Sequence, residues 1–403
     1  MTADLISLAA ARRAVLDAVP GPLAAEEVHT AEALGRVLAG DVEAEHDLPP
    51  FDNSAMDGYA VAAGPPRELE VVGESRAGRP AERALAEGQA IRISTGAVVP
   101  EGADAVVPVE LASLSDGRVT IPEAAPGANV RRAGEDVHAG DTVLTAGAEL
   151  GPAELGVLSS LGHDRVSCSR RPRVALVVTG DELVEPGRPP RPGEIRDSNA
   201  AALAAQAARA GADVVSSERV GDDFDATVAA LDRATADADM VCIAGGVSVG
   251  EHDHVKGALA ELGAGERFWG VAIKPGKPTW FGTCRGVPVL GVPGNPVSAM
   301  VIFHLLGRPA LRWLGGADTA DTRTTAVLDA EVSRSPARAQ ALRCRLTAAG
   351  DGWHVEPTKA QGSHVLTSML GAGALALIPA GDGAVERGER VEIELLPRGT
   401  LSG

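Results

Sequence analysis

The fold is decided by the stretch RPRVALVVTGDEL at residues 171–183. Its apolar middle is typical of a strand buried on both faces, and it ends abruptly in polar residues. Ala-rich helical segments and further apolar strands alternate after it, including DMVCIAGG at 239–246 and VPVLGV at 287–292. Strands that alternate with helices predict a parallel sheet with helices on both faces. We therefore expect a three-layer α/β/α parallel-sheet domain over residues 171–316.

The sequence changes character on both sides of this domain. Residues 49–137 contain short β runs punctuated by Gly and Pro, and residues 317–403 return to the same pattern. We expect a small β domain at 49–137 and a C-terminal, small β-barrel-like domain at 317–403. The remaining segments, 1–48 and 138–170, contain helical patterns near the N-terminus and fewer β runs.

The composition excludes several classes of protein. The chain has 403 residues, 45% of them hydrophobic, which fits several folded domains rather than a disordered chain. A net charge of −18 argues against DNA or RNA binding through a broad basic surface. No apolar run approaches the roughly 18–20 residues of a membrane span. Four widely spaced cysteines without CxxC or CxxH patterns fit neither a disulfide framework nor a zinc site. We expect a cytoplasmic protein.

Three polar segments follow strands of the expected sheet, where ligands of such folds bind. The first is TGDEL, which includes Thr179, Gly180, Asp181 and Glu182. The two adjacent acids are hard oxygen donors of the kind that Mg²⁺ prefers. The same pattern also fits an ordinary turn with solvated acids.

The second segment is GGVSVGEHD at 245–253, which contains the pattern G-x-S-x-G. One interpretation makes Ser248 the nucleophile of an α/β hydrolase, although no HGGG-type segment precedes it and no later His is selected as its base. The other holds that Gly245, Gly246 and Gly250 let backbone amides approach an anion. In that interpretation Asp253 binds or activates a group nearby.

The third segment is GVPGNPVSAM at 291–300. Pro293 and Gly294 precede a predicted helix that Asn295 caps, and Ser298 lies among its first, unpaired amides. This pattern indicates either an anion site or a well-capped helix without a ligand.

Two lysines flank a Pro-Gly turn in KPGKP, at 274 and 277. The chain has only four lysines, so this pair suggests a clamp for a phosphate or another oxyanion. No Walker A, GxGxxG or HExxH motif occurs, which leaves nucleotide triphosphatases, dinucleotide oxidoreductases and zinc proteases with little support. The residues alone thus predict an α/β domain that binds an anionic, phosphorylated ligand with a divalent cation.

Eight motifs in order closely resemble those of the molybdopterin molybdenumtransferase family, which includes the C-terminal domain of gephyrin. They are PPFDNSAMDGYAV, RISTGAVVP, NVRRAGEDV, TGDEL, DSN, GGVSVGEHD, IKPGKP and GVPGNPVS. The resemblance implies the last step of molybdenum cofactor synthesis, in which adenylated molybdopterin and molybdate give the cofactor with Mg²⁺-assisted release of AMP. It also implies an elongated homodimer of four-domain subunits, with residues 1–48 and 138–170 forming a segmented, linker-like domain. Contact with the molybdopterin adenylyltransferase and with acceptor molybdoenzymes is expected as well.

The resemblance also implies roles for individual residues. Asp253, Lys277, Asp57 and Asp136 are the expected catalytic residues, and Asp181, Glu182 and Asp253 the expected Mg²⁺ ligands. Asp57, Asp136, Thr95 and Arg131 would reach the pocket from the partner subunit. The expected substrate-binding residues are Thr95, Arg131, Thr179, Gly180, Asp181, Glu182, Gly245, Gly246, Ser248, Gly250, Lys274, Lys277, Pro293, Gly294, Asn295, Ser298, Arg343 and Ser363.

In the tail, the family positions also match Arg338, Gln361, Gly362 and His364, as contacts to molybdate or pterin. Cys344 stands where many members have Gly, which weakens the assignment of Arg343 beside it. Three other functions stay open on the sequence. They are a pterin adenylyltransferase, a hydrolase that uses Ser248, and a scaffold without catalysis.

Overall fold

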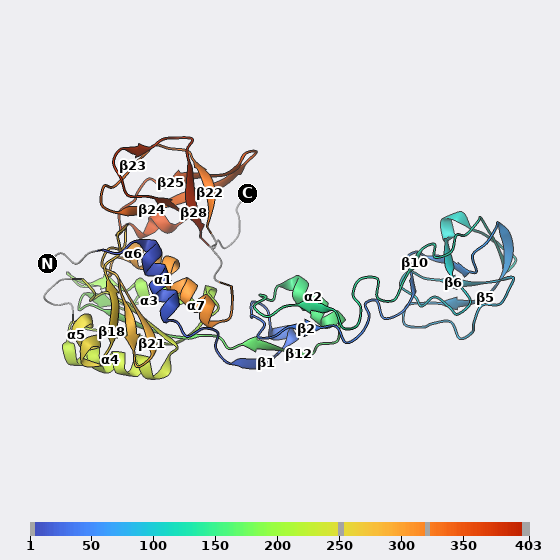
Figure 1. The fold of residues 1–403 in the computed structure, drawn as a ribbon, viewed down its shortest axis with the longest axis horizontal. Coiled ribbons are helices and arrows are strands. Elements are labelled where there is room, and N and C mark those ends of the chain that lie inside the picture. The colour runs from blue at the N-terminus through green and yellow to red at the C-terminus, as the bar shows by residue number, and fades with distance from the viewer. Residues whose placement is uncertain (1–4, 249–253, 319–322, 397–403) are drawn as a thin grey trace.

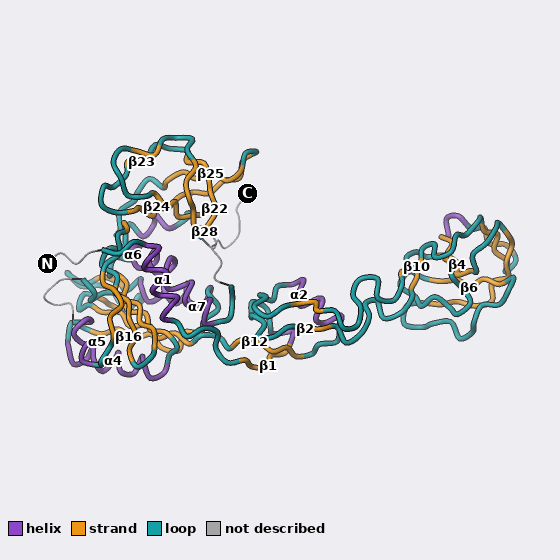
Figure 2. The backbone as a smooth tube through the Cα atoms, in the orientation of Figure 1, coloured by secondary structure: helices purple, strands orange, loops and turns teal. Residues whose placement is uncertain are grey.

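A computed structural model describes residues 5–248, 254–318 and 323–396 of the chain. The molecule is elongated, with two domains side by side at one end and a β domain at the other (Figure 1). A small middle domain that contains α2 (Pro152–Ser160) lies between the two ends. In Figure 2 the segments between the middle and far domains are largely loop.

The α/β domain contains a six-stranded sheet in the order β16-β13-β17-β21-β20-β18. The first four strands are parallel, as expected, whereas β20 and β18 join the edge antiparallel, so the sheet is mixed. The strands are β13 (Arg173–Thr179), β16 (Asp213–Val220), β17 (Met240–Ala244), β18 (Gly265–Trp269), β20 (Trp280–Cys284) and β21 (Val287–Val292).

Alternate residues of β13 enter two different cores, which is why residues 174–178 are all apolar. Val174, Leu176 and Val178 face one set of helices, while Ala175 and Val177 face the other. The first set is α1 (Leu8–Ala18), α3 (Asn199–Arg209), α6 (Pro296–Ile302), the π-helical segment η3 (Phe303–Gly307) and α7 (Arg308–Leu314). The second is α4 (Phe224–Asp237) and α5 (Val255–Glu261). These two helix layers confirm the predicted three-layer architecture.

The middle domain is built from two separate chain segments that pair with each other. Its strands are β1 (Ala25–His29) with β12 (Arg165–Ser169), and β2 (Val42–Glu43) with β11 (Thr142–Leu144); η1 (Thr30–Glu32) and α2 accompany them. Leu48 and Val137 exchange backbone hydrogen bonds where the chain leaves for the far domain and returns. Packing groups α1 with the α/β domain instead, because Ala11 and Val15 are buried in its core.

The far domain is a six-stranded sheet in the order β7-β4-β6-β5-β9-β8. Its strands are β4 (Gly58–Val61), β5 (Arg67–Ser75), β6 (Gln89–Ile93), β7 (Ala105–Pro108), β8 (Ser113–Ser115) and β9 (Arg118–Ile121), with η2 (Val109–Leu111) beside them. A separate pair, β3 (Asn53–Ser54) and β10 (Val130–Arg131), joins its two connecting segments.

The C-terminal domain is a closed five-stranded barrel, which confirms the predicted barrel-like fold. Its order is β24-β25-β22-β28-β26, and β26 pairs back with β24. The strands are β22 (Arg323–Leu328), β24 (Ala339–Ala349), β25 (Gly352–Pro357), β26 (Ala374–Ile378) and β28 (Arg390–Leu395). Smaller elements are β23 (Val332–Ser333), β27 (Ala384–Val385) and η4 (Leu366–Met369). A strand from the α/β domain, β19 (Ile273–Lys274), pairs parallel with β24.

No helix within the described ranges is long and apolar enough to cross a membrane. All four cysteines are buried and free.

Candidate functional site

The polar segments that follow β13, β17 and β21 meet at one edge of the sheet. A Cβ atom at Gly245 would lie 2.8 Å from Thr179 Oγ1, and one at Gly246 would lie 2.9 Å from the same atom. A Cβ at Gly294 would come within 3.7 Å of the Gly245 Cα. Both Gly245 and Gly246 have positive φ, so glycine is needed there for conformation as well as for space. We call this group the strand-end shelf: Thr179, Gly180, Gly245, Gly246, Ser248 and Gly294.

Two side chains hold the shelf from outside. Trp269, the last residue of β18, donates its indole N–H to the Val247 carbonyl oxygen at 2.8 Å. Asn199, the first residue of α3, donates from Nδ2 to the Gly294 carbonyl oxygen at 2.8 Å. Neither residue was predicted to have this role, because a Trp at a strand end and an Asn at a helix start have ordinary structural explanations.

A cavity of about 650 Å³ lies beside the third of these turns. Basic side chains surround it, and none of the described residues that line it is Asp or Glu. We call it the cation cavity; its lining includes Lys274, Lys277, Pro293, Asn295, Ser298, Arg338, Gln340, Arg343, Gln361, Gly362, Ser363 and His364. In a chain with a net charge of −18, this local excess of cations indicates an anion site.

Two domains build the cation cavity together. The lysines and Ser298 come from the α/β domain, while Arg338 and Arg343 come from the barrel. Backbone hydrogen bonds join the two sides, from the Ala339 N–H to the Ala272 carbonyl oxygen at 3.0 Å and from the Val297 N–H to the Ser363 carbonyl oxygen at 3.2 Å. The Ser298 side chain is buried, whereas both lysines are exposed to solvent.

Arg343 is 1% exposed and supports the loop that follows β25. Its Nη2 donates to the carbonyl oxygens of Ala360 and Gly362, and its Nε donates to Ser368 Oγ. Burial lowers the pKa of this guanidinium. Most of its donors are therefore used on the loop, and only Nη1 has no hydrogen-bond partner among the described residues.

The expected Mg²⁺ ligands are only partly described. Asp181 is exposed, and its Oδ1 accepts a hydrogen bond from the Asp222 N–H at 2.9 Å. Glu182 is exposed too and lies over its own turn, since a Cβ at Gly180 would be 2.5 Å from Glu182 Oε2. Asp253 and Gly250 lie outside the described residues. Within the described ranges, no three His, Cys, Asp or Glu side chains are grouped closely enough to hold a metal ion.

Ser248 is exposed at the end of its turn and makes no hydrogen bond to a described His. The hydrolase alternative therefore gains no support from the described part of the chain.

The residues expected from the N-terminal half lie far from the cavity within one chain. Asp57 and Thr95 meet in the far domain, where Asp57 Oδ1 accepts from the Thr95 N–H at 2.7 Å and from its hydroxyl at 3.1 Å. These bonds lower the pKa of Asp57. β10, which includes Arg131, lies at the opposite end of the molecule from α6 (Figure 1). Asp136 is exposed and follows β10 in the connecting segment.

Three family models match consecutive parts of the chain. They are the MoeA N-terminal region (domain I and II) at residues 6–162, the "Probable molybdopterin binding domain" at 175–313 and the MoeA C-terminal region (domain IV) at 325–396.

Full-length relatives match as well. The molybdopterin molybdenumtransferase of Haemophilus influenzae is 37% identical over 97% of this chain and 98% of its own length. Molybdopterin molybdenumtransferase 2 of Mycobacterium tuberculosis is 43% identical over 78% of this chain and 82% of its own. The crystal structure of a molybdopterin biosynthesis MoeA protein from Pyrococcus horikoshii superposes with a TM-score of 0.80 and 33% identity, over 97% of this chain and 99% of that one.

Proposed function

This chain belongs to the MoeA family of molybdopterin molybdenumtransferases, and from that premise we propose how its residues insert molybdenum into molybdopterin. The molybdopterin enters in its adenylated form, molybdate is the second substrate, and AMP is the leaving group. The observation that carries this proposal is the cation cavity beside the strand-end shelf.

Molybdate binds in the cation cavity. It is a tetrahedral, doubly charged oxyanion, and Lys274, Lys277 and Arg338 surround the cavity with positive charge. The buried Ser298 hydroxyl and Arg343 Nη1 add donors of fixed direction, which orient the oxyanion rather than merely attract it. The absence of acids among the described lining residues keeps repulsion low.

The adenylated pterin lies along the strand-end shelf, with its diphosphate toward the cavity. Glycines at 245 and 246 let this turn pack closely against Thr179, which brings the ends of the strands together beside the cavity. Water then adds to phosphorus, the phosphoanhydride bond breaks, and AMP leaves while the pterin keeps its own phosphate. Lys277 stabilises the charge that gathers on the departing oxygens. A role for Asp253 in orienting this water rests on the sequence resemblance.

The residues present fit a Mg²⁺ ion that is bound jointly by protein carboxylates and substrate phosphates. Mg²⁺ is commonly held by one or two carboxylates plus substrate phosphates, and Asp181 and Glu182 are two exposed carboxylates beside the shelf. When bound, the ion would neutralise charge on the diphosphate oxygens.

A homodimer completes the site. The far domain, which contains Asp57, Thr95 and Arg131, lies at the opposite end of the molecule from α6 (Figure 1), and Asp136 lies in the connecting segment. The elongated shape suits an arrangement in which the far domain of one subunit covers the cavity of the other. The cofactor then passes to acceptor molybdoenzymes, after adenylated substrate has arrived from the adenylyltransferase, in the cytoplasm.

The test is to incubate the purified protein with adenylated molybdopterin, Mg²⁺ and increasing molybdate. We expect saturable molybdate dependence of cofactor formation, read by activation of an apo-molybdoenzyme, with AMP released in step. Consumption of ATP with free pterin would instead identify an adenylyltransferase, and labelling of Ser248 by a fluorophosphonate would indicate a hydrolase. Absence of both AMP and active molybdoenzyme contradicts the proposal.

A further inference from the structure

The shape of the cation cavity depends on how the barrel is seated on the α/β domain. Lys274 belongs to β19, which pairs with β24 of the barrel, and Arg338 lies just before β24. A shift of the barrel therefore changes the distance between the cations on the two sides. Whatever fixes this seating also fixes the geometry of the oxyanion site.

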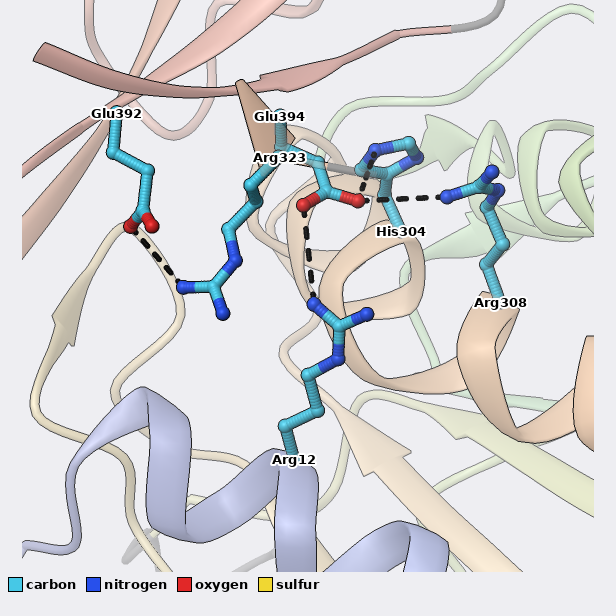
Figure 3. Close-up of polar contacts among 6 residues, drawn as sticks. All are labelled: Arg12, His304, Arg308, Arg323, Glu392 and Glu394. Atoms are coloured by element: carbon cyan, nitrogen blue, oxygen red, sulfur yellow. Dashed lines mark hydrogen bonds and ion pairs between the residues drawn. The ribbon is translucent and has the colours of Figure 1, made fainter. Parts of the chain in front are cut away.

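Glu394 lies at this interface and is 1% exposed. It belongs to β28 of the barrel, yet its carboxylate faces three basic side chains of the α/β domain (Figure 3). Its oxygens are 3.4 Å from Arg308 Nη1, 3.8 Å from His304 Nε2 and 4.0 Å from Arg12 Nη1. These three residues come from α7, η3 and α1, so one barrel carboxylate contacts three different segments.

The charges leave Glu394 as the counter-ion of two guanidinium groups. Burial, together with Arg308 and Arg12, lowers the pKa of His304 to about 3, so its imidazole is neutral at physiological pH. Burial also lowers the pKa of Arg308, and Glu394 opposes that shift. Without the carboxylate, two partly buried cations of the α/β domain would face the barrel without this negative charge.

A second cavity connects this cluster with the joint between the domains. Its volume is about 480 Å³, and its lining includes Arg12 and Glu394 together with Ile273 of β19 and Ala339 of β24. The ion cluster therefore lies one cavity width from the strand pair that also borders the oxyanion site.

Apolar packing alone does not define this seating. Ala341 and Leu375 of the barrel are buried in the core of the α/β domain, which holds the two domains together. Hydrophobic attraction is non-directional and tolerates sliding of one surface over another. A carboxylate held by cations from three segments has a defined direction, and it opposes such sliding.

We propose that Glu394 is a positioning residue for molybdate: it fixes the barrel on the α/β domain and thereby sets the spacing of the cations in the cation cavity. This inference rests on the proposed function, because it assumes that molybdate binds there. Glu394 touches no substrate, and its effect passes through the β19–β24 pair.

The test compares Glu394→Gln with Glu392→Gln. Glu392 is a matched control, since it lies two residues away on the same strand and pairs with Arg323 within the barrel. We expect the KM for molybdate to rise about tenfold in Glu394→Gln, because displacements near 1 Å have effects of that order or more. The KM for adenylated pterin stays within about twofold, saturating molybdate restores the rate, and Glu392→Gln behaves as wild type.

Hydrogen exchange provides the readout of the mechanism. The Ala339 N–H, bonded to the Ala272 carbonyl oxygen, should exchange faster in Glu394→Gln than in Glu392→Gln. An unchanged molybdate KM, or a parallel loss of affinity for both substrates, overturns the inference. If Glu394→Gln does not fold, Arg12→Met is the milder variant, since its contact is the longest of the three. It should give a smaller change of the same kind, and an unaltered molybdate KM overturns the inference equally.

A failure of the proposed function is recognised separately. If Lys277→Ala and Arg338→Ala leave the molybdate KM unchanged, molybdate does not use the cation cavity. If those variants raise it and Glu394→Gln does not, only the positioning role fails.

Discussion

The cation cavity differs in completeness from the Asp57 loop, which comprises residues 55–57 between β3 and β4 of the far domain. The cavity is assembled within one chain from two domains, and backbone hydrogen bonds connect its two sides. Asp57 is exposed, and both hydrogen bonds to its carboxylate come from Thr95 of the same domain. Both regions were expected at one active site. A single chain thus contains a formed cavity lined by basic side chains and, at the other end of the molecule (Figure 1), residues that were expected to act at the same site.

The largest expected effect tests the cation cavity. Lys277→Ala removes a charged donor from the cation cavity and should lower kcat/KM for molybdate by about 10- to 100-fold, as expected for a hydrogen bond to a charged group. Steady-state kinetics with varied molybdate measures this. Lys359→Ala is the matched control, because Lys359 is also exposed and does not line the cavity. Equal losses in the two variants would contradict a specific role.

The next effect tests whether the Asp57 loop acts on a partner's cavity. Asp57→Ala alone and Lys277→Ala alone should both be poorly active. When the two variants are mixed and allowed to exchange subunits, half of the dimers carry one intact composite site, so about a quarter of wild-type activity should return. Activity of the mixture after dissociation and reassociation is the measurement. If nothing returns although mixed dimers form, the two regions do not complement each other between subunits.

A pH effect should appear in the stability of the body that the barrel forms with the α/β domain. His304 has a folded-state pKa of about 3 against an ordinary value of 6.5, so the unfolded chain binds more protons between these values. The stability of the barrel–α/β body therefore falls as pH drops from 6.5 toward 3, by up to about 1.4 kcal/mol per pH unit from this group.

Chemical unfolding of wild type and His304→Gln at several pH values checks this, and the variant should lose the extra slope. His354→Gln is the contrasting variant. Its imidazole bonds to Asp329 and Asp351, which raises its pKa, so its stabilising contribution is lost as pH rises above 6.5. A slope at pH 4–6 that is the same with and without His304 would contradict the assignment.

The smallest effect distinguishes the strand-end shelf from the cation cavity. Trp269→Phe keeps the aromatic ring and removes the N–H that holds the Val247 carbonyl. We expect affinity for adenylated pterin to fall about fivefold, the worth of one hydrogen bond, with molybdate affinity unchanged. Titration of each substrate separately measures both. Trp280→Phe, which removes an N–H bonded to Glu266, is the control on the neighbouring strand.

Much of the architecture follows from local pattern. Apolar runs such as 173–179 predict buried parallel strands, and the turns after them predict where the shelf lies. The antiparallel edge made by β20 and β18 was missed, because strand direction depends on connections that periodicity does not encode. β19 has two residues, too few for any periodic signal, and only its partner in the barrel makes it a strand.

The burial and the partners of individual charged residues could not be predicted from the sequence. In β28, Glu392 and Glu394 alternate with apolar residues, a pattern typical of two side chains on the solvent face of a strand. Docking of the barrel buries Glu394 and leaves Glu392 exposed. Arg343 was likewise predicted to bind an anion, yet most of its N–H groups donate hydrogen bonds to the neighbouring loop. In both cases the deciding partner comes from a segment distant in the sequence.

The reciprocal backbone hydrogen bonds between Leu48 and Val137 join the two chain segments at the base of the far domain. Residues 49–136 therefore form an insertion whose two ends are adjacent in space. Excising residues 49–136 and bridging the gap with a short turn should thus leave a truncated protein that still folds and retains the cation cavity. Mixing this fragment with a second copy that has an intact far domain and a defective cation cavity would test whether the two components together restore activity.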